Sequence, residues 1–241
     1  MKRLVLLLLK FSVKIVIWIS KLEKMNKDKS LTKEYKYAYL NKIIKEVTDG
    51  CNGVELKCFG LENLPEEMGY LMTPNHQGMY DALALLSTHE RYMTAVAKIE
   101  LKDTPIIKTV VEYLDALLMD RSNLRASMKV IKEVTKRLEQ GDNFVIFPEG
   151  TRCRQGNKML EFKGGTFKAV IDAKRPIVPV ALIDCYKPFD KEVKGKIVAQ
   201  IHYLKPICYE EYKDMNSTEV AAYVQERIQK CIDEHEYDYV K

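Results

Sequence analysis

A histidine and an aspartate five residues apart follow a short apolar run and could act together in proton transfer. They are His76 and Asp81, in the segment 74–81 with the sequence PNHQGMYD. On a continuous helix their side chains would lie about 140° apart, but they can meet if the chain turns at Gly78 and Asp81 begins the next helix. Asp81 would then hold one imidazole nitrogen and leave the other to take a proton from a hydroxyl. The alternative is an N-cap aspartate beside an incidental histidine.

A second group of polar residues follows the most apolar of the expected strands. Residues 147–154 read FPEGTRCR, directly after the run that begins at Phe144. Ligand sites of α/β sheets lie beyond the carboxyl ends of strands. Gly150 and Thr151 offer backbone and hydroxyl donors, and the Arg152 guanidinium suits phosphate. The segment is equally consistent with a surface turn that contains a salt bridge. Arg121 also follows a short apolar run, in the sequence Leu118-Met119-Asp120-Arg121.

Several common motifs for cofactors and nucleophiles do not occur. The chain has no G-x-G-x-x-G, Walker A, G-x-S-x-G or H-E-x-x-H sequence. Its six cysteines include no C-x-x-C pair, which favours free thiols in a reducing compartment over zinc or dithiol chemistry. The other histidines, His89, His202 and His235, are expected to be structural or solvated. We therefore predict no metal site and no bound cofactor.

The positive charge of the chain is confined to its N-terminus. Its 241 residues carry 39 Lys and Arg against 34 Asp and Glu, a net charge of +5. Residues 1–36 hold ten basic and three acidic residues, which is +7, so the remaining 205 residues carry −2. A nucleic-acid-binding protein usually has a basic face on the folded domain itself. No nucleic-acid partner is therefore expected.

The first 21 residues, MKRLVLLLLKFSVKIVIWISK, predict an amphipathic helix. Four basic side chains fall on one narrow stripe of it, and apolar residues cover the rest: the stripe consists of Arg3, Lys10, Lys14 and Lys21. This pattern is typical of a helix that lies in a membrane interface with its lysines directed to anionic headgroups. A helix docked on the protein body and a tilted membrane span are the alternatives. A second helix, with Ser30 as N-cap, is expected over about 30–47.

The rest of the chain alternates between expected strands and helices. Strands are expected at 54–59, 70–73, 93–97, 116–119, 144–147, 177–182 and 197–202, with helices at 82–87, 105–113, 124–138, 165–173 and after a capping box at Asn216 and Glu219. This alternation predicts an α/β fold with a mostly parallel mixed sheet flanked by helices. We expect two parts, a membrane-associated helical segment over 1–48 and a catalytic domain over 49–241.

Together these motifs resemble the glycerolipid acyltransferases, specifically the 1-acylglycerol-3-phosphate acyltransferases. The family's Asn-His-x-x-x-x-Asp motif is matched by Asn75, His76 and Asp81. Its Phe-Pro-Glu-Gly-Thr-Arg motif is matched at 147–152. The family's other two motifs, an apolar pair before Asp-Arg and a Val-Pro-Val sequence, are matched at 118–121 and 178–180. The resemblance spans about 54–210. Gly78 stands where a serine is common in the family, and Leu-Met replaces the usual Phe-Ile before Asp120.

The resemblance implies transfer of a fatty acyl group from acyl-CoA or acyl carrier protein to the free hydroxyl of 1-acyl-sn-glycerol-3-phosphate. His76 would be the general base, oriented by Asp81. The substrate would be held by Asn75, Arg121, Glu149, Gly150, Thr151 and Arg152. The enzyme would be monotopic or peripheral, on anionic phospholipid at the cytoplasmic face. The alternatives are a related acyltransferase for glycerol 3-phosphate or another lysophospholipid, and a lipid-binding protein without turnover.

Overall fold

The computed structural model describes residues 2–239 and contains a seven-stranded sheet. Met1 and the last two residues of the expected 49–241 domain lie outside the described part. The strand order is β1-β7-β6-β2-β5-β3-β4. In chain order the strands are β1 (Val54–Phe59), β2 (Leu71–Pro74), β3 (Thr94–Lys98), β4 (Leu117–Met119), β5 (Phe144–Val145), β6 (Ile177–Ile183) and β7 (Ile197–Tyr203). All seven expected strands are confirmed to within three residues at their ends.

The sheet is mostly parallel, with one antiparallel junction between β6 and β7. From β6 through β2, β5 and β3 to β4, each pair of neighbours is parallel. β7 runs antiparallel to β6, and β1 runs parallel to β7. The α/β class and the mixed, mostly parallel sheet are therefore confirmed. Because β2, β5, β3 and β4 share one direction, their carboxyl ends lie at the same edge of the sheet, where residues 75–81, 146–152 and 120–121 follow them.

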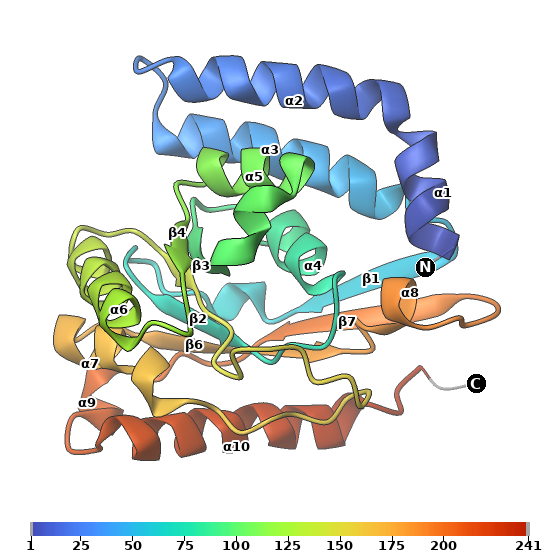
Figure 1. The fold of residues 1–241 in the computed structure, drawn as a ribbon. Helices are drawn as coiled ribbons and strands as arrows, with labels where there is room; N and C mark the ends of the chain where they lie inside the picture. Colours follow the sequence, from blue (N-terminus) through green and yellow to red (C-terminus); the bar gives the residue numbers. More distant parts are fainter. Residues whose placement is uncertain (1, 240–241) are drawn as a thin grey trace.

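Helices cover both faces of the sheet (Figure 1). One layer consists of α1 (Lys2–Lys10), α2 (Ser12–Lys27), α3 (Lys33–Asp49), α4 (Asp81–Thr88) and α5 (Pro105–Tyr113). The opposite layer consists of α6 (Leu124–Glu139), α7 (Lys168–Ala173), α9 (Tyr209–Tyr212) and α10 (Ser217–His235), while α8 (Lys187–Asp190) lies near α1. Three short 3₁₀ helices complete the chain at Leu61–Asn63, Ile99–Asp103 and Gly164–Thr166. The expected capping box at Asn216 and Glu219 is confirmed at the start of α10.

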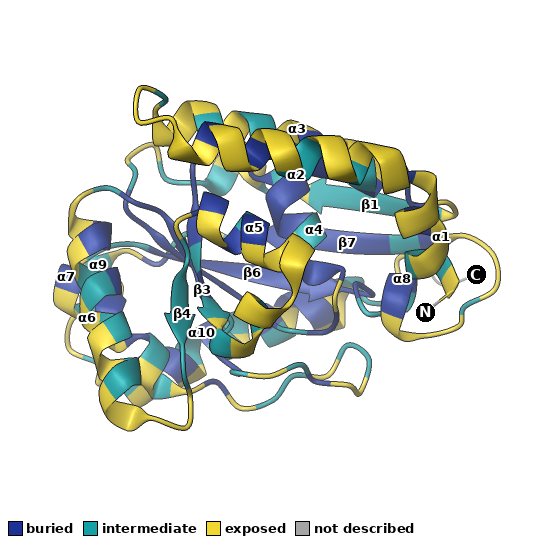
Figure 2. Cartoon of the chain, turned by 45° about the horizontal axis from the view of Figure 1, so that its top comes forward, coloured by how far each residue is buried: buried dark blue, intermediate teal, exposed yellow. Residues whose placement is uncertain are grey.

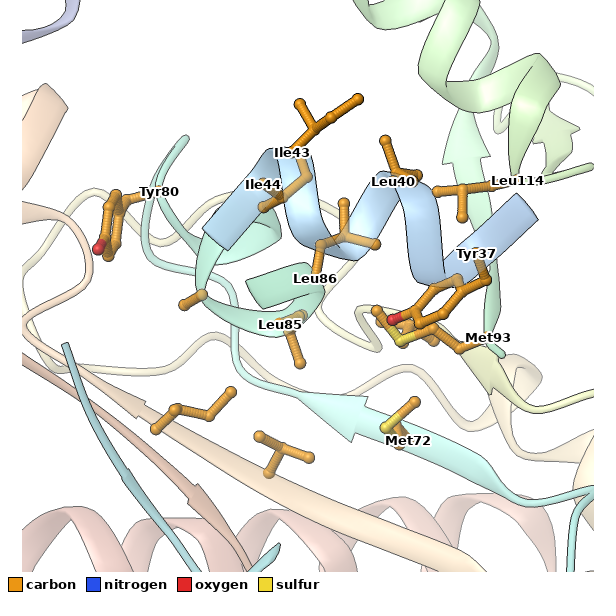
Figure 3. Packing of buried hydrophobic residues seen from close by; sticks show 14 of the residues in the cluster. Tyr37, Leu40, Ile43, Ile44, Met72, Tyr80, Leu85, Leu86, Met93 and Leu114 are labelled. Atoms are coloured by element: carbon orange, nitrogen blue, oxygen red, sulfur yellow. The ribbon is translucent and has the colours of Figure 1, made fainter. Parts of the chain in front are cut away.

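Each helical layer shares an apolar core with the sheet. On the first side, Leu40 and Ile44 of α3 pack with Leu85 of α4 and Met72 of β2, and this cluster continues to Leu22 of α2 (Figure 3). On the second side, the buried faces of α6, α7 and α10 pack on the buried residues of β5 and β6 that point toward these helices. Burial of large apolar side chains is the main favourable term in folding. The N-terminal helices therefore pack into the same core as the sheet.

The N-terminal segment differs in detail from the sequence prediction. The single helix expected over the first 21 residues is divided at Phe11 into α1 and α2, and the buried Phe11 ring contacts Gly50 and Trp18. The N-cap of α3 is Thr32, whose hydroxyl accepts from the Tyr35 N–H, so the expectation of Ser30 was wrong. Among residues 2–239, no helix is both long enough and apolar enough to cross a bilayer.

The basic stripe of α1 and α2 faces the protein, which corrects the prediction that it points to lipid headgroups. Lys14 pairs with Glu46 of α3, and Lys10 donates to the Gly50 carbonyl at 3.0 Å. Arg3 donates to the carbonyls of Val193 and Gly195. The apolar residues between these side chains are instead exposed along the outer side of the two helices (Figure 2): they are Val5, Leu6, Leu8, Leu9, Val13, Val16 and Ile17.

Candidate active site

His76 and Asp81 meet in the loop between β2 and α4. The His76 Nδ1 atom lies 2.7 Å from Asp81 Oδ2. Because an ionised carboxylate only accepts, the Nδ1–H donates and Nε2 keeps a free lone pair. The imidazole also stacks on the Phe147 ring, with 4.1 Å between centroids. With 23% of the His76 side chain exposed, a substrate hydroxyl can reach the ring, whereas Asp81 is only 1% exposed.

The Asp81 carboxylate also holds the turn that brings the two residues together. Its Oδ2 accepts from the backbone N–H groups of Gln77 and Gly78 at 2.7 and 3.0 Å. Asp81 is the first residue of α4, and the N-cap position belongs to Tyr80, so the alternative in which Asp81 is an N-cap is wrong. Within the part of the chain described, Asp81 Oδ1 is buried without a protein partner. The carboxylate thus organises backbone and imidazole with one oxygen.

Glu149 and Asn75 are buried and bond to backbone. Glu149 Oε1 accepts from the His76 N–H at 2.7 Å, and its Oε2 accepts from the Leu160 N–H at 2.8 Å. Burial raises the pKa of the Glu149 carboxyl, and the two N–H groups partly offset this by lowering it. The amide of Asn75 bonds to both the N–H and the carbonyl of Leu182, at the end of β6. Both side chains tie the His76 loop to neighbouring strands.

Arg152, in the segment that follows β5, forms an ion pair with Asp190. Its Nη1 lies 3.2 Å from Asp190 Oδ1, and each side chain is about one-third exposed, at 31% and 30%. Asp190 Oδ2 accepts from the Met79 N–H at 3.0 Å. A Cβ atom on Gly78 would lie 2.5 Å from that same oxygen and 3.0 Å from Tyr186 Cα. Close packing against the 186–190 segment therefore leaves no room for the serine that is common at this position.

The remaining predicted residues lie at the same edge of the sheet. Gly150 is half-buried and has a φ of 74°, a conformation that favours glycine, and Thr151 is exposed. Arg121 follows β4, two strands beyond β5 in the sheet, and is exposed. Among residues 2–239, no hydrogen bond or ion pair connects Arg121 with His76, Glu149 or Arg152. The geometry thus joins His76, Asp81 and Glu149 directly by hydrogen bonds. Asn75 and Arg152 bond to Leu182 and Asp190 beside them, and Arg121 lies to one side.

A network of side-chain hydrogen bonds, which the sequence did not indicate, supports the His76 loop. Gln77 donates to Asn157 Oδ1 at 2.9 Å and accepts from the Cys185 N–H at 2.9 Å. The Asn157 amide in turn bonds to the N–H and the carboxylate of Asp184, which has a φ of 61°. Lys187 pairs with that carboxylate at 2.6 Å. No motif marks Gln77 and Asn157, because their partners lie 27 to 108 positions away in the chain.

Comparisons with known proteins agree with the geometry. Residues 55–183 match the acyltransferase family. A probable 1-acyl-sn-glycerol-3-phosphate acyltransferase of Mycoplasma pneumoniae is 32% identical over 136 residues, which are 54% of this chain and 50% of the relative. The matched segment thus spans about half of that relative. The 1-acyl-sn-glycerol-3-phosphate acyltransferase of Helicobacter pylori is 30% identical over 161 residues, 66% of this chain and 67% of that one.

A solved structure shares the fold over nearly the whole length. The crystal structure of the 1-acyl-sn-glycerophosphate (LPA) acyltransferase PlsC from Thermotoga maritima superimposes with a TM-score of 0.80 and covers 98% of both chains, at 22% identity. At this identity the likeness shows the fold. The family match includes β1 to β6 and both motif loops, from Asn75 to Arg152. On this match over more than half of its length, the chain belongs to the acyltransferase family.

Proposed function

We propose that this protein is a 1-acyl-sn-glycerol-3-phosphate acyltransferase that makes phosphatidic acid for phospholipid synthesis. The observation that carries the proposal is the 2.7 Å contact between His76 Nδ1 and Asp81 Oδ2. The loop is mostly buried, Glu149 bonds to its backbone, and the imidazole is 23% exposed. The names of the similar bacterial proteins support this acceptor. The donor is an acyl thioester, either acyl-CoA or acyl carrier protein.

The proposed reaction needs a base and no enzyme nucleophile, because a thioester is already activated. His76 Nε2 removes the proton from the free hydroxyl of the acceptor, and the oxygen forms a bond with the thioester carbonyl carbon. The C–S bond breaks, and the leaving thiolate takes the proton back from the imidazolium. Asp81 stabilises the imidazolium that forms in between. General-base catalysis of this kind contributes about 10²–10⁴-fold to a rate.

The acceptor's phosphate is proposed to lie against Arg152, next to Gly150 and Thr151. A guanidinium binds phosphate through two parallel N–H bonds, and the Arg152 side chain, about one-third exposed, is open to an anion. Arg121 at the end of β4 is the second cation in this proposal. Asn75 and Glu149 support the site from within, since both side chains bond to backbone.

The proposed partner of the outer apolar face is an anionic phospholipid bilayer. The exposed residues of α1 and α2 include Leu9, Val13 and Val16, which are 66, 73 and 69% exposed. Lys24 and Lys27, also exposed, follow at the end of α2. An apolar helix face with flanking lysines is typical of interfacial binding. With all six cysteines free, we propose the reducing, cytoplasmic side of the membrane.

The function is tested by assaying the full-length protein in anionic vesicles. Lysophosphatidic acid, glycerol 3-phosphate and a lysophospholipid with a larger headgroup are each offered with acyl-CoA and with acyl carrier protein. We expect turnover with lysophosphatidic acid, a loss of about 10²-fold or more in His76→Ala, and an unchanged rate in Asp172→Asn, an exposed position. Preference for another acceptor would identify the related acyltransferase. Lipid binding without turnover would overturn the enzymatic proposal.

A further inference from the structure

Two histidines and a cysteine come together on the far side of the sheet from the N-terminal helices. His202 belongs to β7, and Cys231 and His235 belong to α10. Residues four positions apart lie on the same face of a helix, so both α10 side chains are directed to the same strand. One ring nitrogen from each histidine and the Cys231 Sγ all lie within 4.8 Å of one another. Imidazole and thiolate are the ligands that Zn²⁺ prefers in proteins.

The cluster is separate from the candidate active site. β7 is two strands away from β2, and His202 is on the face of β7 that α10 covers. In the part of the chain that the structure describes, no hydrogen bond or ion pair links it to His76 or Asp81. His202 and Cys231 are only 7 and 6% exposed, whereas His235 is half-buried near the end of α10. The acyl-transfer proposal therefore does not account for this group.

Each histidine of the cluster has a partner at one of its ring nitrogens. His235 Nδ1 lies 2.9 Å from Asp238 Oδ2, and His202 Nε2 lies 3.0 Å from Gln200 Oε1. Both partners are acceptors, so these nitrogens carry the protons, and the opposite nitrogens keep their lone pairs. Histidines that bind metals almost always have such an outer partner, which fixes the tautomer and the ring orientation. Gln200 also donates to the His235 carbonyl at 3.1 Å, which ties it to both ligand histidines.

We infer that His202, Cys231 and His235 form a binding site for a divalent transition-metal ion, Zn²⁺ by its donor set. Tetrahedral Zn²⁺ with its usual bond lengths places ligand atoms roughly 3.3–3.6 Å apart. The three side chains must therefore approach one another by about 1 Å. The His202 and His235 rings stack, with 4.7 Å between their centroids and 20° between their planes. Rotation of the partly buried His235 ring would break this stacking and direct its nitrogen to the ion. On binding, the thiol proton of Cys231 passes to solvent and water takes the fourth position.

Such an ion would fasten the end of α10 to the sheet. β7 and the edge strand β1 are parallel to each other and run opposite to the rest of the sheet. α10 packs on the neighbouring strand β6. His202 also stacks on Phe59 of β1 at 4.6 Å. A ligand that binds only the folded state stabilises it in proportion to the logarithm of its concentration. The inferred role is therefore structural, and it is independent of acyl transfer.

The experiment uses the reduced, EDTA-treated full-length protein in detergent, titrated with Co²⁺ and then with Zn²⁺. We expect one equivalent of Co²⁺ with a sulfur-to-cobalt charge-transfer band, which Zn²⁺ then displaces, and a rise in melting temperature with Zn²⁺. Asp238→Asn should weaken the affinity by about 10- to 100-fold. His235→Gln should weaken it further, and Cys231→Ser should abolish the charge-transfer band. The exposed Cys208, changed to serine, is the matched control and should leave both unchanged.

The inference is overturned if the wild-type protein gives no charge-transfer band. It is also overturned if the band persists in Cys231→Ser, or if Cys208→Ser removes it. Circular dichroism checks the fold of each variant. Because Cys231 is buried, His235→Gln and Asp238→Asn decide the matter if Cys231→Ser does not fold, and an unchanged affinity in both rejects the site.

Discussion

Glu149 Oε1 accepts a hydrogen bond from the backbone N–H of His76 at 2.7 Å, across 73 positions of the chain. The other oxygen accepts from the Leu160 N–H at 2.8 Å. A carboxylate between two N–H donors connects the loop after β5 with the loop after β2 and with the segment before α7. The backbone of the proposed base is thereby held by a residue of the neighbouring motif.

We predict that Glu149→Gln lowers both the stability and the turnover number. Glutamine offers one acceptor oxygen where the site needs two, and its NH₂ group would face an N–H. An unsatisfied buried donor costs about 1–3 kcal/mol in the free energy of unfolding. Urea unfolding and steady-state kinetics measure the two effects. Glu161→Gln, an exposed change nearby in the chain, is the control. A variant with unchanged stability and only a higher KM for acceptor would show that Glu149 contacts the substrate instead.

We predict that His89 makes the free energy of unfolding depend on pH. Its ring is fully buried between Tyr37, Tyr70 and Tyr203, with Nε2 at 2.8 Å from the Tyr70 hydroxyl. Burial lowers the His89 pKa from 6.5 to about 4. Between these two values the unfolded chain binds a proton that the folded protein does not. Stability is therefore lost as the pH falls from about 6.5 to about 4, by about 3 kcal/mol in total.

Replacing His89 by glutamine should remove this contribution. The free energies of unfolding of the wild-type protein and His89→Gln should then converge as the pH falls through that range. Denaturant unfolding at a series of pH values measures the difference. Curves that stay parallel would show that His89 does not titrate between the two states.

The sequence was most informative where a motif is contiguous. Residues 147–152 and the His76–Asp81 pair follow apolar runs, and apolar runs before turns mark strand ends whether or not the fold is known. The turn that brings His76 to Asp81 was also predictable, because the two residues are only five positions apart and Asp81 begins the next helix. These features depend on local geometry, which a short stretch of sequence specifies.

Partners far apart in the chain could not be predicted in the same way. Asn157 bonds to Gln77 and Asp184, and Asp190 pairs with Arg152, without any local pattern that distinguishes these residues from surface polar residues. The basic stripe of the N-terminal helices shows a related limit. Helical periodicity places Lys14 on the polar side, but a lysine bonds equally well to Glu46 or to a headgroup, so the orientation depends on tertiary packing.

The observed orientation leads to a prediction about membrane binding. Val13→Glu and Val16→Glu place a charge on the outer face of α2, where exposed positions tolerate it at little cost in stability. Binding to anionic vesicles should weaken, while activity on detergent-dispersed lysophosphatidic acid remains. Vesicle sedimentation measures the binding, and Ala222→Glu on α10, across the sheet, adds the same charge as a control. Equal effects at the two sites would argue against a bilayer on the N-terminal face.

The Arg152–Asp190 ion pair predicts a change in acceptor affinity. Asp190 places a negative charge 3.2 Å from the cation that is proposed to bind the acceptor's phosphate. Asp190→Asn removes that charge but keeps an oxygen for the Met79 N–H. The KM for lysophosphatidic acid should fall by about two- to fivefold, the range for a partly exposed ion pair, with kcat unchanged. Glu192→Gln, an exposed acid two residues away, controls for the loss of charge. A higher KM in Asp190→Asn would mean that Asp190 holds Arg152 in its binding position, and Arg152→Ala would then show the same increase.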